Sequence, residues 1–503
     1  MSVKVDAAPT KTTGSRSGAE FVESIRDGRA VYIEGERVKD VTTHPAFRNS
    51  VRSIARLYDI AREPANQEAM TYVSPKTGRR VSRFWMIPRS REDLATRRKA
   101  SQRWAEETCG LMGRAPDVGS FLPGMASAPD VFGRGGTKFA ENLTRFYEKA
   151  RDNDVYLTYV VVPPQIDRSK PAHMQEEPDL HAGVVKERDD GIVIRGAQML
   201  GTGTAISDYV LLSCIHPMRP GEENYANSMV IPISSPGLKV ISRRSYARAA
   251  TSLYDYPLSR RFDETDSFVV FDNVFVPWEN VFVYRNIELA RAQWFETPAH
   301  VLGNHQSHVR YATKMRFVMG LAKRIVQMNG TESQPAVQGM LGEMGAYAVM
   351  HESLIVAQEA ACTIDRNGVA VPGKRQHYAN QVFQTLHHSK VMDMFRELVG
   401  GGVLQLPSSF EDFENAEISN DINRYIRSPG STSQQRVALM KLAWDMIGSE
   451  FAGRHQQYEK FYAGAPFIVR THVYREYDFK SATDLVDGAL DPSKYDGYDL
   501  GRI

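Results

Sequence analysis

The sequence predicts an α+β fold in the order helices, strands, helices, and three changes of hydrophobic period predict it. Apolar residues recur at helical spacing from about 19 to 150, gather in short valine- and isoleucine-rich runs from about 155 to 285, and return to helical spacing from about 288 to 465. At 503 residues, 42% of them apolar, the chain is long enough for several domains around a large core. We expect five regions: a disordered polar tail over 1–18, a helical domain over 19–153, a β-barrel domain over 154–286, a helical bundle over 287–470 and a C-terminal tail over 471–503.

In the first region, the clearest helix begins after Ser90. Serine is a favoured N-cap, acidic residues fill the first turn after it, and Gly110 and Gly113 follow near the end of the pattern. The basic run 97–99 in this helix is interpreted as a solvated face.

The second region contains short strand-like runs separated by Gly, Pro, Asn and Asp. They are VYLTYVVV (155–162), GIVIRG (191–196), YVLLSCI (209–215), SMVIPI (228–233), LKVIS (238–242) and SFVVFDNVFV (267–276). Runs of this length and composition predict strands, and their number and spacing favour a compact barrel.

The third region contains long helical patterns. The clearest runs from 308 to 330 and stops at Asn329-Gly330, a typical helix end. The stretches 334–364, 376–399 and 434–451 behave in the same way. Four long helices with short joints predict a bundle.

Composition excludes several classes of function. The 62 basic and 60 acidic residues leave a formal charge of +2, which offers no electrostatic reason to expect nucleic acid or an anionic membrane as partner. The three cysteines, at 109, 214 and 362, are far apart and form no zinc or disulfide pattern, so we expect a cytoplasmic protein. No metal site is expected either, because the histidines at 305, 308, 387 and 388 lack a nearby acidic ligand set.

The segment GTGTA (201–205) lies between two apolar stretches and resembles a phosphate loop only superficially. A dinucleotide fingerprint would need glycine where Ile206 stands, and the other phosphate loop would need a lysine. Glycines permit close approach, and the hydroxyls of Thr202 and Thr204 donate and accept hydrogen bonds, so the segment favours a flat ligand with polar edges. The alternative from the residues alone is a tight turn with solvated threonines.

Several strings, in order along the chain, carry a family resemblance. They are VYIEGERVKDVTTHPAFRN (31–49), LMGRAPD (111–117), PPQIDRSK (163–170), YDYPLSRRFDE (254–264), SFVVFDNVFVPWENV (267–281), LQLPSSFEDF (404–413) and WDMIGSEFAGRHQQYE (444–459). In these strings the chain resembles the oxygenase components of 4-hydroxyphenylacetate 3-monooxygenase, within the acyl-CoA dehydrogenase-like architecture. The match extends from about 19 to 465.

The resemblance implies an N-terminal helical domain, a central β-barrel and a C-terminal four-helix bundle that assembles into a homotetramer. It implies a two-component system, in which a separate NAD(P)H:flavin reductase supplies reduced FAD and this chain combines it with molecular oxygen. A flavin hydroperoxide then hydroxylates an aromatic substrate, which requires that water be kept out and that the ring be electron-rich. FMN in place of FAD is left open.

The resemblance also implies the cofactor-binding residues. They are Tyr159, Val161, Gln165, Asp167, Arg168, Thr202, Thr204, Gly401, Ser428, Gly430, Ser431 and Thr432. The alternatives are local: an Asp-Arg pair in a turn for 165–168, a helix C-cap for 400–402 and an ordinary N-cap for 428–432. A helix start is also suited to a pyrophosphate, because its free N–H groups and dipole attract anions.

The implied substrate-binding residues are Arg114, Val118, Tyr159, Ser213 and His216, and the implied catalytic residues are Arg114, Tyr159 and Thr204. Two of these positions depart from the family: Val118 stands where the family has tyrosine, and Tyr159 stands where it has histidine. A tyrosine, with an ordinary pKa near 10, does not readily take a phenolic proton as histidine does. Three alternatives follow for the substrate. It is an acidic phenol such as a halophenol or nitrophenol, or it is an aniline or indole. The third alternative is a phenol whose phenolate form is stabilised by His216 or, more readily, by Arg114.

Other functions stay open at this point. One is hydroxylation of an aromatic amino acid tethered to a carrier protein. A second is a dehydrogenase acting on an acyl thioester, for which Glu343, Glu352 or Glu359 would have to face the flavin. A third is a structural subunit that kept the fold and lost the chemistry.

Overall fold

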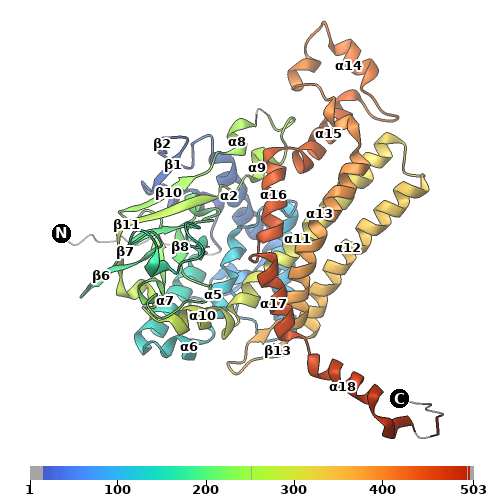
Figure 1. Ribbon diagram of the computed structural model, residues 1–503. Coiled ribbons are helices and arrows are strands. Elements are labelled where there is room, and N and C mark those ends of the chain that lie inside the picture. Colours follow the sequence, from blue (N-terminus) through green and yellow to red (C-terminus); the bar gives the residue numbers. More distant parts are fainter. Residues whose placement is uncertain (1–14, 251, 496, 499–503) are drawn as a thin grey trace.

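The computed structural model describes residues 15–250, 252–495 and 497–498, so residues 1–14 of the predicted tail lie outside the described residues. Figure 1 shows the strands on one side of the molecule, the long bundle helices on the other, and α2 and α5 between them. The predicted order of helices, strands and helices is therefore confirmed.

The N-terminal part of the chain is mainly helical. Its helices are α1 (Gly18–Ser24), α2 (Arg48–Arg62), α3 (Pro64–Met70), α4 (Arg91–Glu107), α5 (Phe121–Ala126), α6 (Pro129–Gly133) and α7 (Thr137–Asp152), beside a hairpin of β3 (Thr71–Val73) and β4 (Arg80–Ser82). Ser90 caps α4 as predicted, in a capping box with Asp93. The predicted tail is too long at its C-terminal end, because Arg16 is buried and its Nη2 donates to Asp208 (3.0 Å) just before α1 begins.

The strand domain consists of two sheets. The larger has the order β2-β1-β10-β11-β7-β6 and the smaller the order β12-β9-β8-β5. Their strands are β1 (Ala30–Ile33), β2 (Glu36–Arg37), β5 (Leu157–Val160), β6 (Gly183–Arg188), β7 (Gly191–Gln198), β8 (Tyr209–Leu212), β9 (Ser228–Pro232), β10 (Leu238–Ser242), β11 (Ser267–Pro277) and β12 (Val281–Val283). A bridge between Val162 and Met199 joins the ends of β5 and β7 across the two sheets.

All six predicted strand runs form strands, but the region boundaries do not separate the sheets from the helices. β1 belongs to the predicted helical domain and yet pairs in parallel with β10, with Val31 opposite Val240. Two short helices, α8 (Tyr246–Ala249) and α9 (Ser259–Phe262), connect β10 to β11.

The bundle follows α10 (Ile287–Phe295). Its helices are α11 (Ala299–Asn329), α12 (Pro335–Ala360), α13 (Lys374–Val399), α15 (Ser433–Ile447) and α16 (Glu450–Phe461), with a small hairpin of β13 (Thr363–Ile364) and β14 (Ala370–Val371) and a short helix α14 (Ser419–Tyr425). Gly330 ends α11 in the left-handed conformation (φ 71°), as the Asn-Gly signal predicts. The predicted C-terminal tail begins inside α17 (Pro466–Glu476) and contains α18 (Phe479–Leu490), which extends away from the body (Figure 1).

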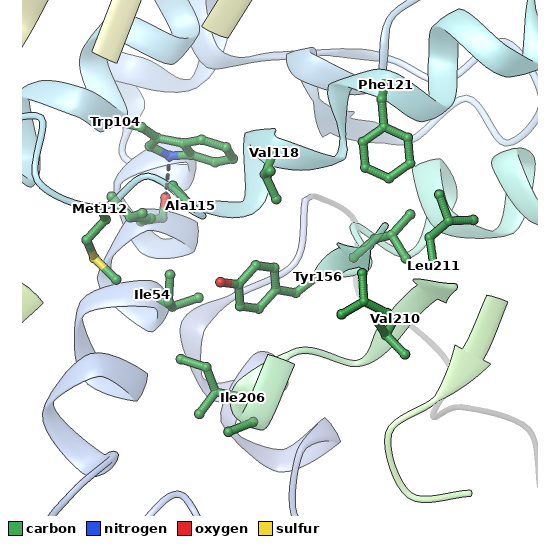
Figure 2. Packing of buried hydrophobic residues seen from close by; sticks show 14 of the residues in the cluster. Ile54, Trp104, Met112, Ala115, Val118, Phe121, Tyr156, Ile206, Val210 and Leu211 are labelled. Carbon is green, nitrogen blue, oxygen red and sulfur yellow. Dashed lines mark hydrogen bonds between the residues drawn. The ribbon is translucent and has the colours of Figure 1, made fainter. Parts of the chain in front are cut away.

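One hydrophobic core joins the first helices to the strands. Figure 2 shows Tyr156, which precedes β5, pointing into the space among Ile54 of α2, Val118 and Ile206. Trp104 of α4 packs nearby, and its indole N–H donates to the carbonyl of Leu57 (2.7 Å). The segments around 114 and 204 are thus fixed against each other from both sides.

Candidate active site

Arg114 lies where the helical region, the strands and the bundle meet. The carboxylate of Glu264 accepts hydrogen bonds from the backbone N–H groups of Gly113 (2.9 Å) and Arg114 (2.5 Å). The hydroxyl of Tyr156 donates to the carbonyl of Arg114. The backbone of Arg114 is therefore held from both sides by the strand domain.

The side chain of Arg114 is enclosed by aromatic rings. Its guanidinium carbon lies 4.7 Å from the ring centroid of Tyr159, 4.9 Å from that of Tyr462 and 5.9 Å from that of Tyr458. Only 8% of the residue is exposed, and Nη1 has no hydrogen-bond partner among the described residues. Burial alone would lower the pKa of Arg114, but the neighbouring tyrosines and Glu264 raise it well above its ordinary value. A permanent cation with an unused donor therefore faces this space.

Tyr159 of β5 belongs to an aromatic wall beside Arg114. Its ring meets Phe121 edge-on at 5.4 Å and Trp294 at 6.3 Å. Val118 lies in the short turn before α5 and is 1% exposed; Figure 2 shows it between Trp104 and Phe121. Burial raises the pKa of Tyr159 to about 12, although Arg114 opposes this. Tyr159 is thus a neutral phenol at pH 7, as the comparison with histidine predicts.

The GTGTA segment is a buried turn against the start of β11. Gly201 N–H donates to the Ser267 carbonyl (2.8 Å), and Gly203 N–H donates to the Thr265 carbonyl (3.1 Å). Gly203 has φ 74°, and a Cβ there would lie 2.8 Å from the Tyr156 hydroxyl. The alternative of solvated threonines is therefore wrong, because Thr202 and Thr204 are both buried.

The two threonine hydroxyls differ in their partners. Thr204 shares a hydrogen bond with Thr158 (3.2 Å), whereas Thr202 donates to Asp266 (2.6 Å). Burial would raise the pKa of Asp266, but Arg454 (2.8 Å) and Arg243 (3.0 Å) hold it far below its ordinary value. Because this carboxylate only accepts, the Thr202 oxygen presents lone pairs to any further partner.

Four other predicted residues follow β5 in the chain. Gln165 and Arg168 lie in the loop after β5, where Asp167 bonds to Ser169 (2.6 Å) and pairs with Lys170 (3.2 Å), so the expected Asp-Arg pair is wrong. Val161, at the start of this loop, is half-buried.

Two more predicted residues follow β8. The hydroxyl of Ser213 is buried without a hydrogen-bond partner among the described residues. His216 lies beside Cys214 (3.5 Å), and burial lowers the pKa of its imidazole.

The remaining cofactor residues lie elsewhere in the chain. Figure 1 shows α14 and α15 at the top of the bundle, away from α5 and β8. There Thr432 caps α15 in a capping box with Gln435, Ser428 accepts from Arg436, and Gly430 takes φ 70° at the turn before Ser431. Gly401 is exposed at the end of α13. One chain therefore does not bring these residues to Arg114. Thr432 forms the expected N-cap of α15, and Gly400, beside Gly401, forms the expected C-cap of α13.

Sequence reasoning missed the bundle's part of the site. Arg454, Tyr458 and Tyr462 follow one another at helical spacing along α16 and its end, and they face Asp266 and Arg114. Arg454 and Tyr458 stand four residues apart within the string 444–459. In the sequence, that string is evidence only of the family resemblance.

Behind Tyr458 lies a buried charge cluster. Glu459 is 0% exposed, and its carboxylate accepts from Arg310 (2.7 and 2.9 Å), from Gln384 (2.7 Å) and from Lys314. Burial lowers the pKa of Lys314 to about 8, although Glu459 opposes this. The cluster locks α16 to α11 and α13 next to the aromatic rings.

Comparison with known proteins gives this geometry a family. Residues 17–283 match the family described as 4-hydroxyphenylacetate 3-hydroxylase N terminal, and residues 290–491 match its C-terminal counterpart. The chain belongs to this family. It is 36% identical to the 4-hydroxyphenylacetate 3-monooxygenase oxygenase component of Klebsiella oxytoca, over 95% of this chain and 93% of that protein.

Other relatives act on different phenols. The chain is 37% identical to the oxygenase component of 4-nitrophenol 2-monooxygenase from Rhodococcus sp, over 90% of this chain and 87% of that protein. It is also 36% identical to a monooxygenase from Streptomyces globisporus, over 98% of this chain and 94% of that protein. The substrate of that enzyme is a β-amino acid with a 3-chloro-4-hydroxyphenyl group, carried by a peptidyl-carrier protein. A crystal structure of a 4-hydroxyphenylacetate 3-monooxygenase oxygenase component with FAD and 4-hydroxyphenylacetate superimposes with a TM-score of 0.90, at 31% identity, over 95% of this chain and 99% of that one.

These findings confirm the predicted fold and the class of enzyme, an FAD-dependent aromatic monooxygenase of the two-component type. The site fits a bound ring with hydrogen-bonding edges, since Arg114 Nη1 and the neighbouring Tyr458 Oη are buried without partners among the described residues. The thioester dehydrogenase alternative gains no support: Glu343 pairs with Lys390 (2.7 Å), Glu359 with Arg98 (2.6 Å), and Glu352 is exposed.

Among the described residues, no helix is long and apolar enough to cross a membrane.

Proposed function

We propose that this oxygenase component hydroxylates an acidified phenol, one carrying a nitro or halogen substituent, which binds as the phenolate against Arg114. The observation that supports this most directly is the buried guanidinium of Arg114, whose Nη1 lacks a partner among the described residues beside the neutral ring of Tyr159. A permanent cation lowers the pKa of a neighbouring phenol, and it does so without accepting the proton. Tyr159, with a pKa of about 12, is no substitute for a basic histidine.

The other residues have supporting roles in this proposal. Reduced FAD, delivered by a separate NAD(P)H-dependent reductase, would supply the two electrons that activate molecular oxygen, and the transferred oxygen atom would come from molecular oxygen. Val118, Phe121 and Trp294, all buried, would form the apolar side of the substrate pocket and exclude water from it. Ser213 and His216, which follow β8, would line the substrate pocket.

The same arrangement supports the proposed contacts with FAD. Tyr159, Val161, Thr202 and Thr204 would contact the ring, with Thr202 accepting a hydrogen bond because its own proton goes to Asp266. Gln165, Asp167 and Arg168, on the loop after β5, would cover it. Gly401 and the segment 428–432 would contact the dinucleotide from a neighbouring copy in a homotetramer, since one chain holds them apart from Arg114. A cytoplasmic location suits a partner reductase that uses NAD(P)H.

The relatives provide a reason to favour acidified phenols. Two of them act on a nitrophenol and on a chlorophenol, and nitro and chloro groups lower the pKa of a phenol. The resemblance implies a tyrosine and a histidine where this chain has Val118 and Tyr159, and this difference argues against 4-hydroxyphenylacetate itself. A chlorophenol on a carrier protein satisfies the same chemical demand as a free one.

The experiment is a series of para-substituted phenols, supplied with reduced FAD by a generic flavin reductase. We expect kcat/KM to rise as the phenol pKa falls, and the pH profile for each phenol to follow the pKa of that phenol rather than the ordinary histidine value near 6.5. In Arg114→Ala, hydrogen peroxide should replace most of the hydroxylated product, whereas Arg114→Lys should keep part of the coupling because it keeps the charge. Full coupling in Arg114→Ala, or a preference for anilines and indoles, would contradict the proposal.

A further inference from the structure

A hollow in the molecule lies between α2, α9 and the end of α4. It is a cleft of about 440 Å³. Its charged lining consists of one glutamate, Glu107, and the guanidinium groups of Arg48, Arg52, Arg56, Arg260 and Arg261. We call it the arginine cleft.

The charge of the arginine cleft is not balanced by the protein. The whole chain is close to neutral, with 62 basic and 60 acidic residues, so this excess is local. Glu107 is shared between Arg56 (3.2 Å) and Arg103 (3.4 Å), and Arg56 also pairs with Glu63 (2.6 Å). The other four arginines form no ion pair among the described residues: Arg48, Arg52, Arg260 and Arg261.

The spacing along α2 brings three of these like charges together. Arg48, Arg52 and Arg56 stand four residues apart, so their side chains project from the same face of the helix. Like charges at this spacing destabilise a helix. An anion between α2 and α9 would turn the repulsion into attraction.

The lining also indicates the kind of anion. A guanidinium group can donate two parallel hydrogen bonds to two oxygens of a phosphate. Asn49 and Ser53 add polar groups to the wall of the cleft. The cleft has the volume of a small-molecule site, and Leu253 (57% exposed) and Phe262 give it an apolar side. We propose that the arginine cleft binds the phosphate of an organic phosphate ester.

The cleft is connected to the site of Arg114 through short segments. Ser53 of α2 donates to the carbonyl of Arg261 (2.6 Å), and α9 leads directly into Glu264, which holds the backbone of Arg114. Thr108, on the other wall, begins the segment that leads to Gly113. A phosphate ester in the cleft would therefore stabilise both segments that position Arg114.

Two sources present this chemistry. One is the phosphopantetheine arm of a carrier protein that delivers an aromatic thioester, the form of substrate used by the Streptomyces globisporus relative. The other is a nucleotide. The proposal concerns the phosphate ester common to both, and it does not depend on which phenol is hydroxylated.

The test is titration calorimetry of the full-length protein with 4′-phosphopantetheine, AMP, inorganic phosphate and unphosphorylated pantetheine. We expect the two esters to bind, pantetheine not to bind, and inorganic phosphate to bind more weakly and to compete. Tighter binding of 4′-phosphopantetheine than of AMP would identify the carrier arm as the source, and the reverse order a nucleotide. Either order supports the proposal.

Two variants locate the binding. Arg52→Ala and Arg261→Ala should each weaken the better ester by about tenfold or more, because each removes a charge-assisted hydrogen bond. Arg324→Ala, at an exposed position on α11 remote from the cleft, should bind like wild type. The proposal is overturned if neither ester binds, if pantetheine binds as well as its phosphate, or if Arg324→Ala weakens binding as much as Arg52→Ala does.

Discussion

Gly113 and Arg114 meet different demands although they are neighbours. Glu264 accepts hydrogen bonds from both backbone N–H groups, so the peptide is fixed. The two positions differ in the side chain that their surroundings allow. Arg114 must reach among the rings, whereas a Cβ on Gly113 would lie 1.9 Å from the hydroxyl oxygen of Tyr458. The absence of a side chain at 113 is what allows Tyr458 to lie against the guanidiniums of Arg114 and Arg454.

Gly113→Ala tests this close approach. Because neither the fixed peptide nor the packed ring can yield freely, we expect a loss of about 1–3 kcal/mol in the free energy of unfolding, the usual cost of overpacking. Displacement of Tyr458 should also lower the ratio of hydroxylated product to peroxide. Urea denaturation and product analysis measure the two effects.

Gly339→Ala is the matched control. Gly339 lies inside α12, and no atom of a neighbouring side chain or segment comes within 4 Å of the place that a Cβ would take. Alanine there should therefore be neutral or raise stability by about 0.5–1 kcal/mol. If Gly113→Ala proved as harmless as Gly339→Ala, the contact with Tyr458 would not constrain the site.

At the scale of elements, local signals predict where helices begin and end better than which faces they bury. Ser90 and Gly330 mark the ends of α4 and α11 because capping depends on a few adjacent residues. The interpretation of the basic run 97–99 as a solvated face is wrong for Arg97, whose guanidinium is buried and donates to the carbonyls of Phe84 (2.7 Å) and Met86. An arginine that satisfies distant carbonyls has no local sequence signature.

The same limit applies to the sheet and to the site. The pairing of β1 with β10 joins segments that are far apart in the chain, and no pattern within either strand specifies that partner. Arg114 and Thr204 are identified by resemblance to a family, not by spacing. The residues of α16 that complete the site escape prediction, because Tyr458 and Tyr462 resemble ordinary packing residues until α16 is docked.

Glu459→Gln tests how α16 is docked. The substitution leaves Arg310 and Lys314 as buried cations without their counter-charge, which typically costs about 3–5 kcal/mol. We expect the urea midpoint to fall accordingly and coupling of oxygen to product to fall with it, because Tyr458 and Tyr462 flank position 459. The double variant Glu459→Gln, Lys314→Met should recover part of the stability by removing one unpaired cation.

Glu343→Gln provides the comparison at the surface. Glu343 pairs with Lys390 (2.7 Å) on exposed faces of α12 and α13, where water screens both charges, so its loss should barely move the midpoint. Equal effects of the two substitutions would mean that the buried cluster does not hold α16 in place.

On the scale of the whole molecule, the bundle carries neutral histidines in its interior. Burial lowers the pKa of His300, His305, His308 and His388 to about 3 in each case. Unfolded histidine has a pKa near 6.5, so the folded state is favoured above pH 6.5 and loses this advantage as the pH falls toward 3. Asp117 acts in the opposite sense, since burial raises its pKa to about 6 and the folded state takes up its proton first.

The protein should therefore be labile to mild acid. Each of these four histidines should lower the free energy of unfolding by roughly 1.4 kcal/mol per pH unit below 6.5, and Asp117 should raise it by about as much below pH 6. Together these five groups should lower it by about 4 kcal/mol per unit between pH 6 and 5. His377 and His455, whose pKa burial also lowers, act in the same direction. Urea midpoints measured at pH 8, 6 and 5.5 give this slope directly.

His388→Leu separates histidine titration from a general effect of acid. Both ring nitrogens of His388 lack a hydrogen-bond partner among the described residues, so an apolar side chain of similar size should cost little at pH 8. The variant should take up one proton fewer than wild type when it unfolds below pH 6.5. The slope of its free energy of unfolding against pH should therefore be shallower than that of wild type by roughly 1.4 kcal/mol per pH unit. Gly339→Ala removes no titratable group and should keep the wild-type slope. If His388→Leu kept that slope as well, the buried imidazole of His388 would not contribute to the acid sensitivity of the bundle, and the proposed link between histidine burial and stability at neutral pH would fail at this position.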